Sequence, residues 1–569
     1  MLRRLLNIIV FFIPVLLLLR ALFFCVELWQ SCYTQFLHQI LQAIDRPDLN
    51  NLIREQYFPE AKYHGLQVGC SIVLLLCVLL YILMLYAHRR VTKSIHQLLC
   101  FGAEKKRQLI SLWQSTTLRA RILFFLILVA ILIRSLYYVF YFPIQYDEAW
   151  NANLFLRKSW YYSLAAYNNY PLHNLCTWLF VQGFGDSVFV LRLPSVLAGL
   201  SVCMLIGLGI YAITRRENLA LVGILLFACM PVSVFYMMYS RGVMFEIGFA
   251  VLSVLILHRF TQQGINHKKM FLLAFVQALG VLSMLSHIYF CMALSVTLLI
   301  WVLSQRISLR FFFSFLIEMF ALCVLFLLPM LLGTGITPGW QAAVSPQTIS
   351  IVSWWTFIKE TSSFVSASSW LLPVSFFLLP IVLYVTYIKQ KVGLCISILL
   401  LSMMALLFVI PASTHVLPPP RAFGCMVLIP WFLCLLFFAC IETKSLWGFI
   451  LSLAVCISGL SYQSHTHPFL NWSYQLDKQV AVVAEKMGKA KIHSVYNDCR
   501  SFDYFIPGIS YYAYRLHEDI HFASSAPNST RYQMQDISRF DCVVVDHTVA
   551  PPPGFFVLYR FDDIVVYSK

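Results

Sequence analysis

Residues 121–150 read RILFFLILVAILIRSLYYVFYFPIQYDEAW, an apolar run that ends in two adjacent acidic residues. A helix needs about 20 apolar residues to cross the roughly 30 Å hydrocarbon core of a bilayer, and this run is long enough. Asp147 and Glu148 follow within a few residues of its end. Because carboxylates near membrane depth are costly, they usually have a function there. The stretch therefore predicts a membrane-spanning helix with a functional site at one end; the alternative is an acidic pair at the membrane interface that only marks a loop.

The rest of the chain has the same apolar character. Of its 569 residues, 60% are hydrophobic and 12% are charged, and the mean hydropathy is +0.76. An ordinary globular chain is about 45–50% apolar and about 25% charged, so a soluble enzyme and a disordered chain are both excluded. We predict an all-α polytopic membrane protein with about thirteen transmembrane helices, at residues 7–29, 68–88, 121–142, 193–213, 219–238, 243–260, 270–287, 289–304, 311–332, 371–388, 392–411, 422–441 and 445–462.

The basic residues indicate how the chain is oriented. The net charge is +16, but residues 463–569 hold 10 Lys/Arg and 11 Asp/Glu, so the excess lies in the apolar part. With the N-terminus in the cytoplasm, the inside connections carry 20 Lys/Arg and the longer outside ones before residue 463 carry 9. This asymmetry predicts a cytoplasmic N-terminus and an extracytoplasmic C-terminal part. A basic face with interleaved aromatic residues is missing, so no nucleic acid is expected as a partner.

Three parts are predicted along the chain. Residues 1–118 form two transmembrane helices with an outer loop and a basic cytosolic linker, residues 119–462 a transmembrane catalytic core, and residues 463–569 a small α/β domain. In the last part, LDKQVAVVAEKMGKA has helical periodicity, DCVVVDH is a buried-strand pattern and FFVLYRFDDIVVYSK is typical of a hairpin. Cys499 and Cys542 also lie there, and whether they form a disulfide depends on geometry.

Two arginines lie in outer connections, which the predicted orientation expects to be poor in Lys and Arg. Arg241 precedes the run at 243–260, close to Glu246, and Arg421 precedes the run at 422–441. Because outer connections are normally poor in Lys and Arg, these two residues indicate an anionic ligand.

Two further outer cations are weaker signals. Arg192 begins the run at 193–213, and a helix cap or a salt bridge with Asp186 explains it without a ligand. Lys359 lies in the outer loop at 333–370.

Three motifs resemble a known family when taken in order. They are DEAWNANLFL…NNYPLHNLCTWLFVQGFGDSVFVLRLPSVLAG, YSRGVMFE and PRAFGCMVLIP. The chain resembles GT-C glycosyltransferases, in particular the bacterial branch of the protein O-mannosyltransferase and aminoarabinose-transferase superfamily, over about residues 119–462. Three positions depart from the pattern: Asn169 stands where the aminoarabinose-transferase group has Lys, His173 where an aromatic residue is common, and Glu246 where Asp is usual.

The resemblance implies a GT-C-like fold and a membrane glycosyltransferase. Such an enzyme moves a sugar from a polyprenyl-phosphate donor to a hydroxyl of a glycan, lipid or protein acceptor on the outer face of the membrane. A prenyl-linked donor needs no nucleotide-binding fold, and the sequence has no GxGxxG after a strand and no P-loop.

The roles follow from what the reaction needs. A carboxylate has to take the acceptor's proton, which Asp147 fits, and cations have to meet the departing phosphate. Glu148 either orients Asp147 or joins it in holding a divalent metal; no cofactor is required. The expected substrate-binding residues are Arg241, Glu246, Arg421, His173, Asn169 and Lys359.

Two other classes of protein are alternatives. A transporter or a lipid-linked-sugar flippase would place ionisable groups near the bilayer midplane and often shows an internal repeat, whereas here the charges gather at outer helix ends. A membrane scaffold with a lectin-like tail would not need the acidic pair. The resemblance favours cell-envelope glycan biosynthesis at the bacterial inner membrane. The alternative is the endoplasmic reticulum, where Asn471 and Asn528 would be glycosylation acceptors.

Overall fold

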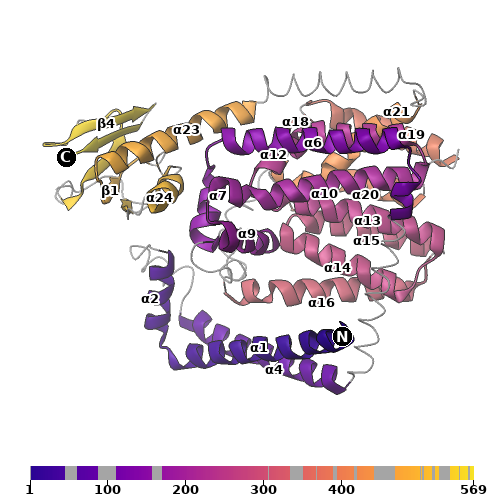
Figure 1. Ribbon diagram of the computed structural model, residues 1–569, viewed down its shortest axis with the longest axis horizontal. Helices are drawn as coiled ribbons and strands as arrows, with labels where there is room; N and C mark the ends of the chain where they lie inside the picture. The colour runs from indigo at the N-terminus through magenta and orange to yellow at the C-terminus, as the bar shows by residue number, and fades with distance from the viewer. Residues whose placement is uncertain are drawn as a thin grey trace. The chain divides into compact units, whose positions relative to one another are not determined.

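The computed structural model is mainly helical, with one small sheet near the C-terminus (Figure 1). It describes residues 2–44, 60–86, 110–156, 170–304, 307–333, 350–366, 368–388, 394–414, 420–440, 468–499, 502, 505–515, 520–524, 539–549, 552–561 and 564–569. The chain divides into two compact units, the first of which is mainly Met1–Ile122.

The first unit contains a helix pair of its own. Helices α1 (Leu2–Gln30) and α4 (Glu60–Tyr86) pack together, and α2 (Tyr33–Ile44) follows α1. The Tyr63 hydroxyl donates to the Leu28 carbonyl at 2.7 Å, and both side chains are buried. Because this bond satisfies a carbonyl near the C-terminal end of α1, it fixes how α4 lies against it.

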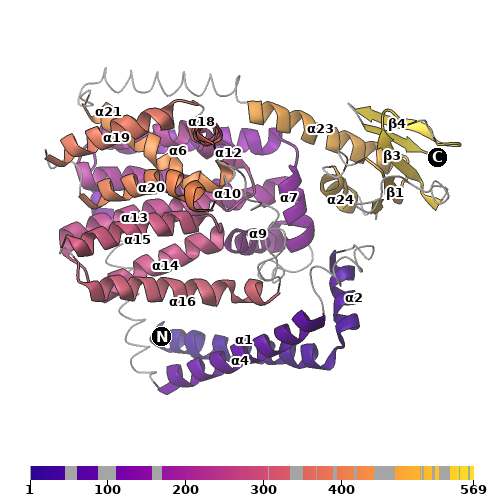
Figure 2. The ribbon, with the colours of Figure 1, turned by 180° about the vertical axis from the view of Figure 1, so that it is seen from behind.

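The second unit is a bundle built around one long helix, α10 (Val188–Thr214), which packs against α9, α11, α12 and α13. Figure 2 shows the bundle from behind, with α20 beside α13 and α15. Gly207 of α10 lets the helices approach closely, since a Cβ there would lie 2.5 Å from Ile224 Cδ1. The other helices of the bundle are α6 (Leu118–Tyr141), α7 (Tyr146–Asn151), η3 (Ala152–Leu156), α9 (Pro171–Phe184), α11 (Glu217–Cys229), α12 (Pro231–Met238), α13 (Val243–Gln263), α14 (His267–Ser283), α15 (His287–Leu303), α16 (Leu309–Gly333), α18 (Ile351–Ser366), α19 (Leu371–Ile388), α20 (Leu394–Thr414), η4 (Pro420–Val427) and α21 (Leu428–Cys440).

The helices make this a multi-pass membrane protein. Among the described residues, five helices are long and apolar enough to cross a membrane, and two bent helix pairs bring the number to seven. Twelve of the thirteen predicted runs overlap a described helix, whereas 445–462 lies outside the described residues. The count of thirteen spans and the orientation stay predictions.

Two predicted stretches differ from the structure. The run at 219–238 is bent by 68° between α11 and α12. Pro231 is the first residue of α12 and has no N–H to continue the α11 ladder, so the helix ends and restarts there. The outer loop predicted at 333–370 contains α18, whose axis makes a 90° bend with that of α19.

The C-terminal part is a small α/β fold, as predicted. Its sheet has the order β2-β1-β3-β5-β4, with β1 parallel to β2 and β3, and β5 antiparallel to β3 and β4. The predicted helix, buried strand and hairpin correspond to α23, β3 and β4–β5; the residues between β4 and β5 lie outside the described part. The bounds are α23 Pro468–Lys489, β1 Ser494–Asn497, α24 Ile506–Arg515, β2 His521–Ser524, β3 Cys542–Asp546, β4 Phe556–Phe561 and β5 Ile564–Ser568.

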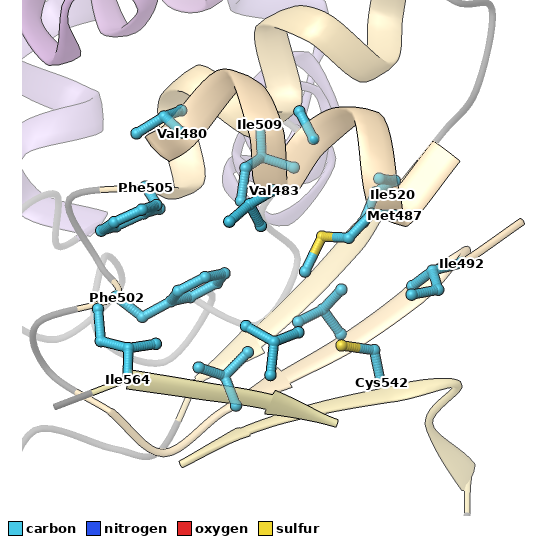
Figure 3. Close-up of a cluster of buried hydrophobic side chains, with 14 of the residues drawn as sticks. Val480, Val483, Met487, Ile492, Phe502, Phe505, Ile509, Ile520, Cys542 and Ile564 are labelled. Carbon is cyan, nitrogen blue, oxygen red and sulfur yellow. The ribbon is translucent and has the colours of Figure 1, made fainter. Parts of the chain in front are cut away.

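One face of this sheet carries an apolar core with α23 and α24 (Figure 3), and alternate residues of the strands, such as Val543 and Val565, form a second buried cluster. Val480, Val483 and Met487 lie at helical spacing on α23 and are at most 2% exposed. They pack with sheet residues such as Cys542 and with α24. Cys499 and Cys542 are both free, buried thiols, so they do not form the disulfide that the sequence left open.

Candidate active site

The acidic pair lies on the short helix α7, just after the membrane-crossing helix α6. Glu148 is the third residue of α7, and its Oε2 accepts the backbone N–H of Gln145 at 3.1 Å, which caps the helix start. This bond belongs to the capping-box pattern, in which the third residue reaches back to the residue before the helix. Residues one apart on a helix point in different directions, so Asp147 and Glu148 face different surroundings.

Glu148 forms a fully buried ion pair with Arg192 of α10. Arg192 Nε donates to Glu148 Oε1 at 2.9 Å, and Nη2 donates to Oε2 at 2.5 Å. The other Arg192 donors reach the carbonyls of Val139, Phe142 and Pro143 at 2.8–3.0 Å. All five guanidinium N–H groups are therefore satisfied.

Both oxygens of the Glu148 carboxylate also accept hydrogen bonds from several donors. Besides Arg192 and Gln145, it accepts the backbone N–H of Ser240 at 2.7 Å. The ion pair thus joins the end of α6, the start of α7, α10 and the segment before α13. Arg192 pairs with Glu148 and not with Asp186, so of the two explanations that need no ligand, the salt bridge with Asp186 is not the one that the structure contains.

Asp147 faces a second guanidinium, that of Arg241. Arg241 Nη2 pairs with Asp147 Oδ2, and the Tyr239 hydroxyl donates to the same oxygen at 3.3 Å. The Arg241 side chain is 6% exposed and that of Asp147 is 34% exposed. Arg241 also lies over the rings of Tyr239 and Tyr170, at 5.0 and 5.6 Å from their centroids. Cation–π contacts of this kind hold the guanidinium plane in place.

His173 is linked to the Asp147–Arg241 pair through the hydroxyl of Ser195. It is fully buried on α9, and its Nε2 lies 3.0 Å from Ser195 Oγ on α10. Ser195 Oγ donates to the carbonyl of Arg241 at 3.3 Å. A hydroxyl has one proton to give, so Ser195 accepts from His173 Nε2–H whenever it donates to the Arg241 carbonyl. His173 thereby supports the backbone that carries Arg241.

Glu246 lies one turn into α13, and it is fully buried. Neither of its carboxylate oxygens has a hydrogen-bond partner among the described residues. Gly424 of η4 packs against this carboxylate, since a Cβ at that position would be 3.4 Å from Glu246 Oε2. The chain of η4 therefore covers this carboxylate closely.

The remaining predicted residues lie elsewhere. Arg421 is in η4, but its side chain is outside the described part, as is the whole of Asn169. Lys359 lies on α18 with its ammonium over Trp370 at 4.7 Å and over Trp355 at 5.7 Å. The structure thus brings together Asp147, Glu148, Arg241 and His173, and no contact of the described residues joins Lys359 to them.

Sequence reasoning missed four polar residues of this site. They are Tyr170 and Tyr239, which stack on Arg241, and Asn151 and Asn174, which hydrogen-bond to one another. Asn151 follows Asp147 by four residues, the spacing that places two side chains on one helix face. That spacing was the available signal. A metal site at Asp147 and Glu148 stays a prediction, because no group of three or more His, Cys, Asp or Glu gathers among the described residues.

Comparisons with known proteins give similarity at the level of structure. No protein-family model and no curated protein matches the sequence. The crystal structure of ArnT from Cupriavidus metallidurans in the apo state is similar at 12% identity and a TM-score of 0.49, over 78% of this chain and 97% of that one. The same protein bound to undecaprenyl phosphate gives 12% identity and a TM-score of 0.40, over 80% and 98%.

Proposed function

We propose that this protein is a membrane glycosyltransferase that moves a sugar from a polyprenyl-phosphate donor to an acceptor hydroxyl. The observation that carries the proposal is the pair of Asp147 and Arg241 at the end of a membrane-crossing helix. A partly exposed carboxylate and a nearly buried guanidinium are the two groups that this reaction needs. One accepts a proton and the other meets the negative charge of the leaving phosphate.

In the proposed reaction, the acceptor oxygen attacks the anomeric carbon while the bond from that carbon to the phosphate oxygen breaks. The bonding electrons leave with the polyprenyl phosphate, and the acceptor proton goes to Asp147. Asp147 has to be ionised to accept it, and the Arg241 guanidinium and the Tyr239 hydroxyl both favour the ionised form. Its second oxygen, Oδ1, receives no hydrogen bond from the described residues and is the one we assign as base.

Arg241 is the group that we assign to the phosphate. A guanidinium stays charged and binds phosphate oxygens through two parallel N–H groups. Arg241 lies over the rings of Tyr170 and Tyr239, and its N–H groups are the part that would meet an anion. An arriving phosphate would compete with Asp147 for these N–H groups, so donor binding would release the carboxylate for its role as base.

The other predicted residues keep supporting roles in this proposal. Arg421, Asn169, Glu246 and Lys359 contribute to donor binding, and His173 holds the backbone of Arg241 through Ser195. Glu148 positions Asp147 by fixing the start of α7. The acceptor is a glycan, a lipid or a protein. The charge distribution supports an active site on the outer face of a bacterial inner membrane.

Donor profiling tests the proposal. The purified full-length protein is incubated with a panel of polyprenyl-phosphate sugars and an acceptor mixture, and free polyprenyl phosphate is measured. We expect release with one donor or a few. The Asp147→Asn protein should release little, whereas Asp186→Asn, a change of the same chemistry beyond α9, should behave as wild type. The flippase alternative predicts the opposite result: a labelled lipid-linked sugar changes leaflets and stays intact.

Arg241 variants test the assignment of the phosphate. Arg241→Ala should weaken donor use, and Arg241→Lys should restore it only in part, because lysine keeps the charge but lacks the planar fork. The measurement is the KM for the donor in each variant, with the acceptor KM as the internal control. Normal donor kinetics in Arg241→Ala would place the phosphate elsewhere.

A further inference from the structure

Two short helices present matched pairs of side chains in the candidate active site. On α7, Asn151 follows Asp147 by four residues; at α9, Asn174 follows by four the residue that precedes the helix, Tyr170, and its N–H donates to the Tyr170 carbonyl at 2.8 Å. On α7, this spacing places Asp147 and Asn151 one turn apart on the same helix face. Arg241 contacts both first members, Asp147 and Tyr170. The second members, Asn151 and Asn174, contact each other.

The contact between the second members forms a buried layer of two amides. Asn151 Nδ2 donates to Asn174 Oδ1 at 2.6 Å, and the two residues are 3% and 0% exposed. This bond leaves Asn151 Oδ1 and Asn174 Nδ2 without a hydrogen-bond partner among the described residues. Turning both amides over exchanges the roles of the two residues, but one acceptor and one donor still remain. Buried polar atoms are nearly always satisfied, so this pair calls for a partner.

We propose that the Asn151–Asn174 pair binds one hydroxyl group of the transferred sugar; this inference rests on the glycosyltransferase function proposed above. A hydroxyl donates one hydrogen bond and accepts another, so it satisfies Oδ1 and Nδ2 at once. An ammonium group cannot accept a bond, a carboxylate cannot donate one, and a deoxy position does neither. The pair therefore selects a neutral hydroxyl.

The position of the amides suits this role. The Cβ atoms of residues four apart on a helix are about 5–6 Å apart, a distance comparable to the width of one sugar ring. A sugar whose anomeric carbon lies beside Asp147 would then bring a hydroxyl from the far side of its ring to Asn151 and Asn174, once the side chains that cover these buried amides move aside. A buried water molecule has the same bonding capacity, so the test has to separate the two.

The test compares one accepted donor with its monodeoxy analogues. For the wild-type protein, removal of one particular hydroxyl should lower kcat/KM by about 10- to 100-fold, the usual effect of leaving a buried donor and acceptor unpaired. In Asn174→Leu the parent donor should itself be poor, and the deoxy analogue should be used about equally well. Asn174→Asp replaces the donor group by an acceptor at unchanged volume, and should give the same loss of discrimination.

Gln277→Leu is the matched control. Gln277 is a buried amide of α14 that donates to Ser253 Oγ at 2.5 Å, outside the site. Its loss should lower the thermal stability while the ratio between parent and deoxy donors stays at the wild-type value. If the Asn174 variants also keep the wild-type ratio for every analogue, the amides hold only water and the inference is wrong. The same conclusion follows if they slow all donors by one common factor.

A second measurement does not depend on transfer. Saturation-transfer-difference NMR detects methyl glycosides bound to wild-type protein and to Asn174→Asp, whose fold is checked by its melting temperature. Binding that is lost in the variant supports the sugar subsite even if no donor is turned over, in which case only the proposed transfer fails. Equal binding to both proteins, or none to either, overturns the subsite.

Discussion

Asp147 and Glu148 are neighbours in sequence but have different surroundings. Glu148 is 2% exposed and accepts hydrogen bonds from Arg192, Gln145 and Ser240, so its carboxylate has no capacity left for a substrate. Asp147 is partly exposed, and both of its hydrogen-bond donors reach the same oxygen. The difference divides two chemically similar residues into a structural one and a reactive one.

For the reactive residue, we expect Asp147→Asn to lower single-turnover transfer by about 10²- to 10⁴-fold, the usual contribution of a positioned base. Asparagine keeps the shape and loses the basic oxygen, so the melting temperature should stay close to the wild-type value. Donor binding is measured in parallel. Unchanged transfer would remove Asp147 as the base, and lost donor binding would reassign it to holding the sugar.

For the structural residue, we expect Glu148→Gln to destabilise the fold by about 3–5 kcal/mol, the typical cost of removing one partner of a buried ion pair. Arg192 would keep its charge in a site that is 1% exposed. Denaturant unfolding in detergent measures the loss. Added EDTA should leave wild-type activity unchanged if Glu148 only orients Asp147; EDTA-sensitive activity would support the metal role instead.

At the scale of elements, a helix of the C-terminal domain lies against the helix that carries the acidic pair. The ring of Tyr511 on α24 is buried against Ile144, Ala149 and neighbouring apolar residues. Its hydroxyl donates to the Asp186 carbonyl at 2.6 Å, and Asn153 Nδ2 donates to the Pro507 carbonyl at 2.9 Å. These contacts make α24 a support for α7 and η3.

We therefore expect Tyr511→Ala to loosen α7 without touching the reacting groups. Truncating a buried aromatic ring removes packing that nothing replaces. Amide hydrogen exchange over residues 144–156 should become faster, while exchange in β3 and β5 stays as in wild type. Tyr514→Ala, on the same helix at a ring that is 54% exposed, is the control. Equal exchange in all three proteins would show that α24 does not support the site.

At the scale of the whole molecule, the orientation in the membrane decides which compartment the site faces. The excess of Lys and Arg on one side predicts that the connection between α10 and α11 is cytoplasmic and that α23 lies outside. Arg216 and Lys489 are exposed residues in these two places. A membrane-impermeant maleimide applied to intact cells should label Lys489→Cys above the wild-type background and should not label Arg216→Cys. The reverse pattern would place the site on the cytoplasmic side.

The helices and the small domain were predictable because their signals are local. Apolar runs, and the spacing of Val480, Val483 and Met487, reflect the partition of nearby side chains between water and apolar surroundings. The bend between α11 and α12 was missed because the hydropathy of a run does not depend on whether its helix is straight; Pro231 was the local signal for it. Within the site, the sequence identified Asp147 as a carboxylate close to membrane depth and Arg241 as a cation in an outer connection.

The partners of those charges were decided by tertiary structure alone. Nothing in the sequence indicates that Arg192 reaches Glu148, 44 residues away, and leaves Arg241 to Asp147. The choice depends on which distant segments pack around α7, because two adjacent helix residues point in different directions and each contacts a different neighbour. The sequence thus determined that the chain crosses a membrane and where its charges gather. Only packing between distant segments decided which carboxylate is buried as a structural anion and which stays open to a substrate.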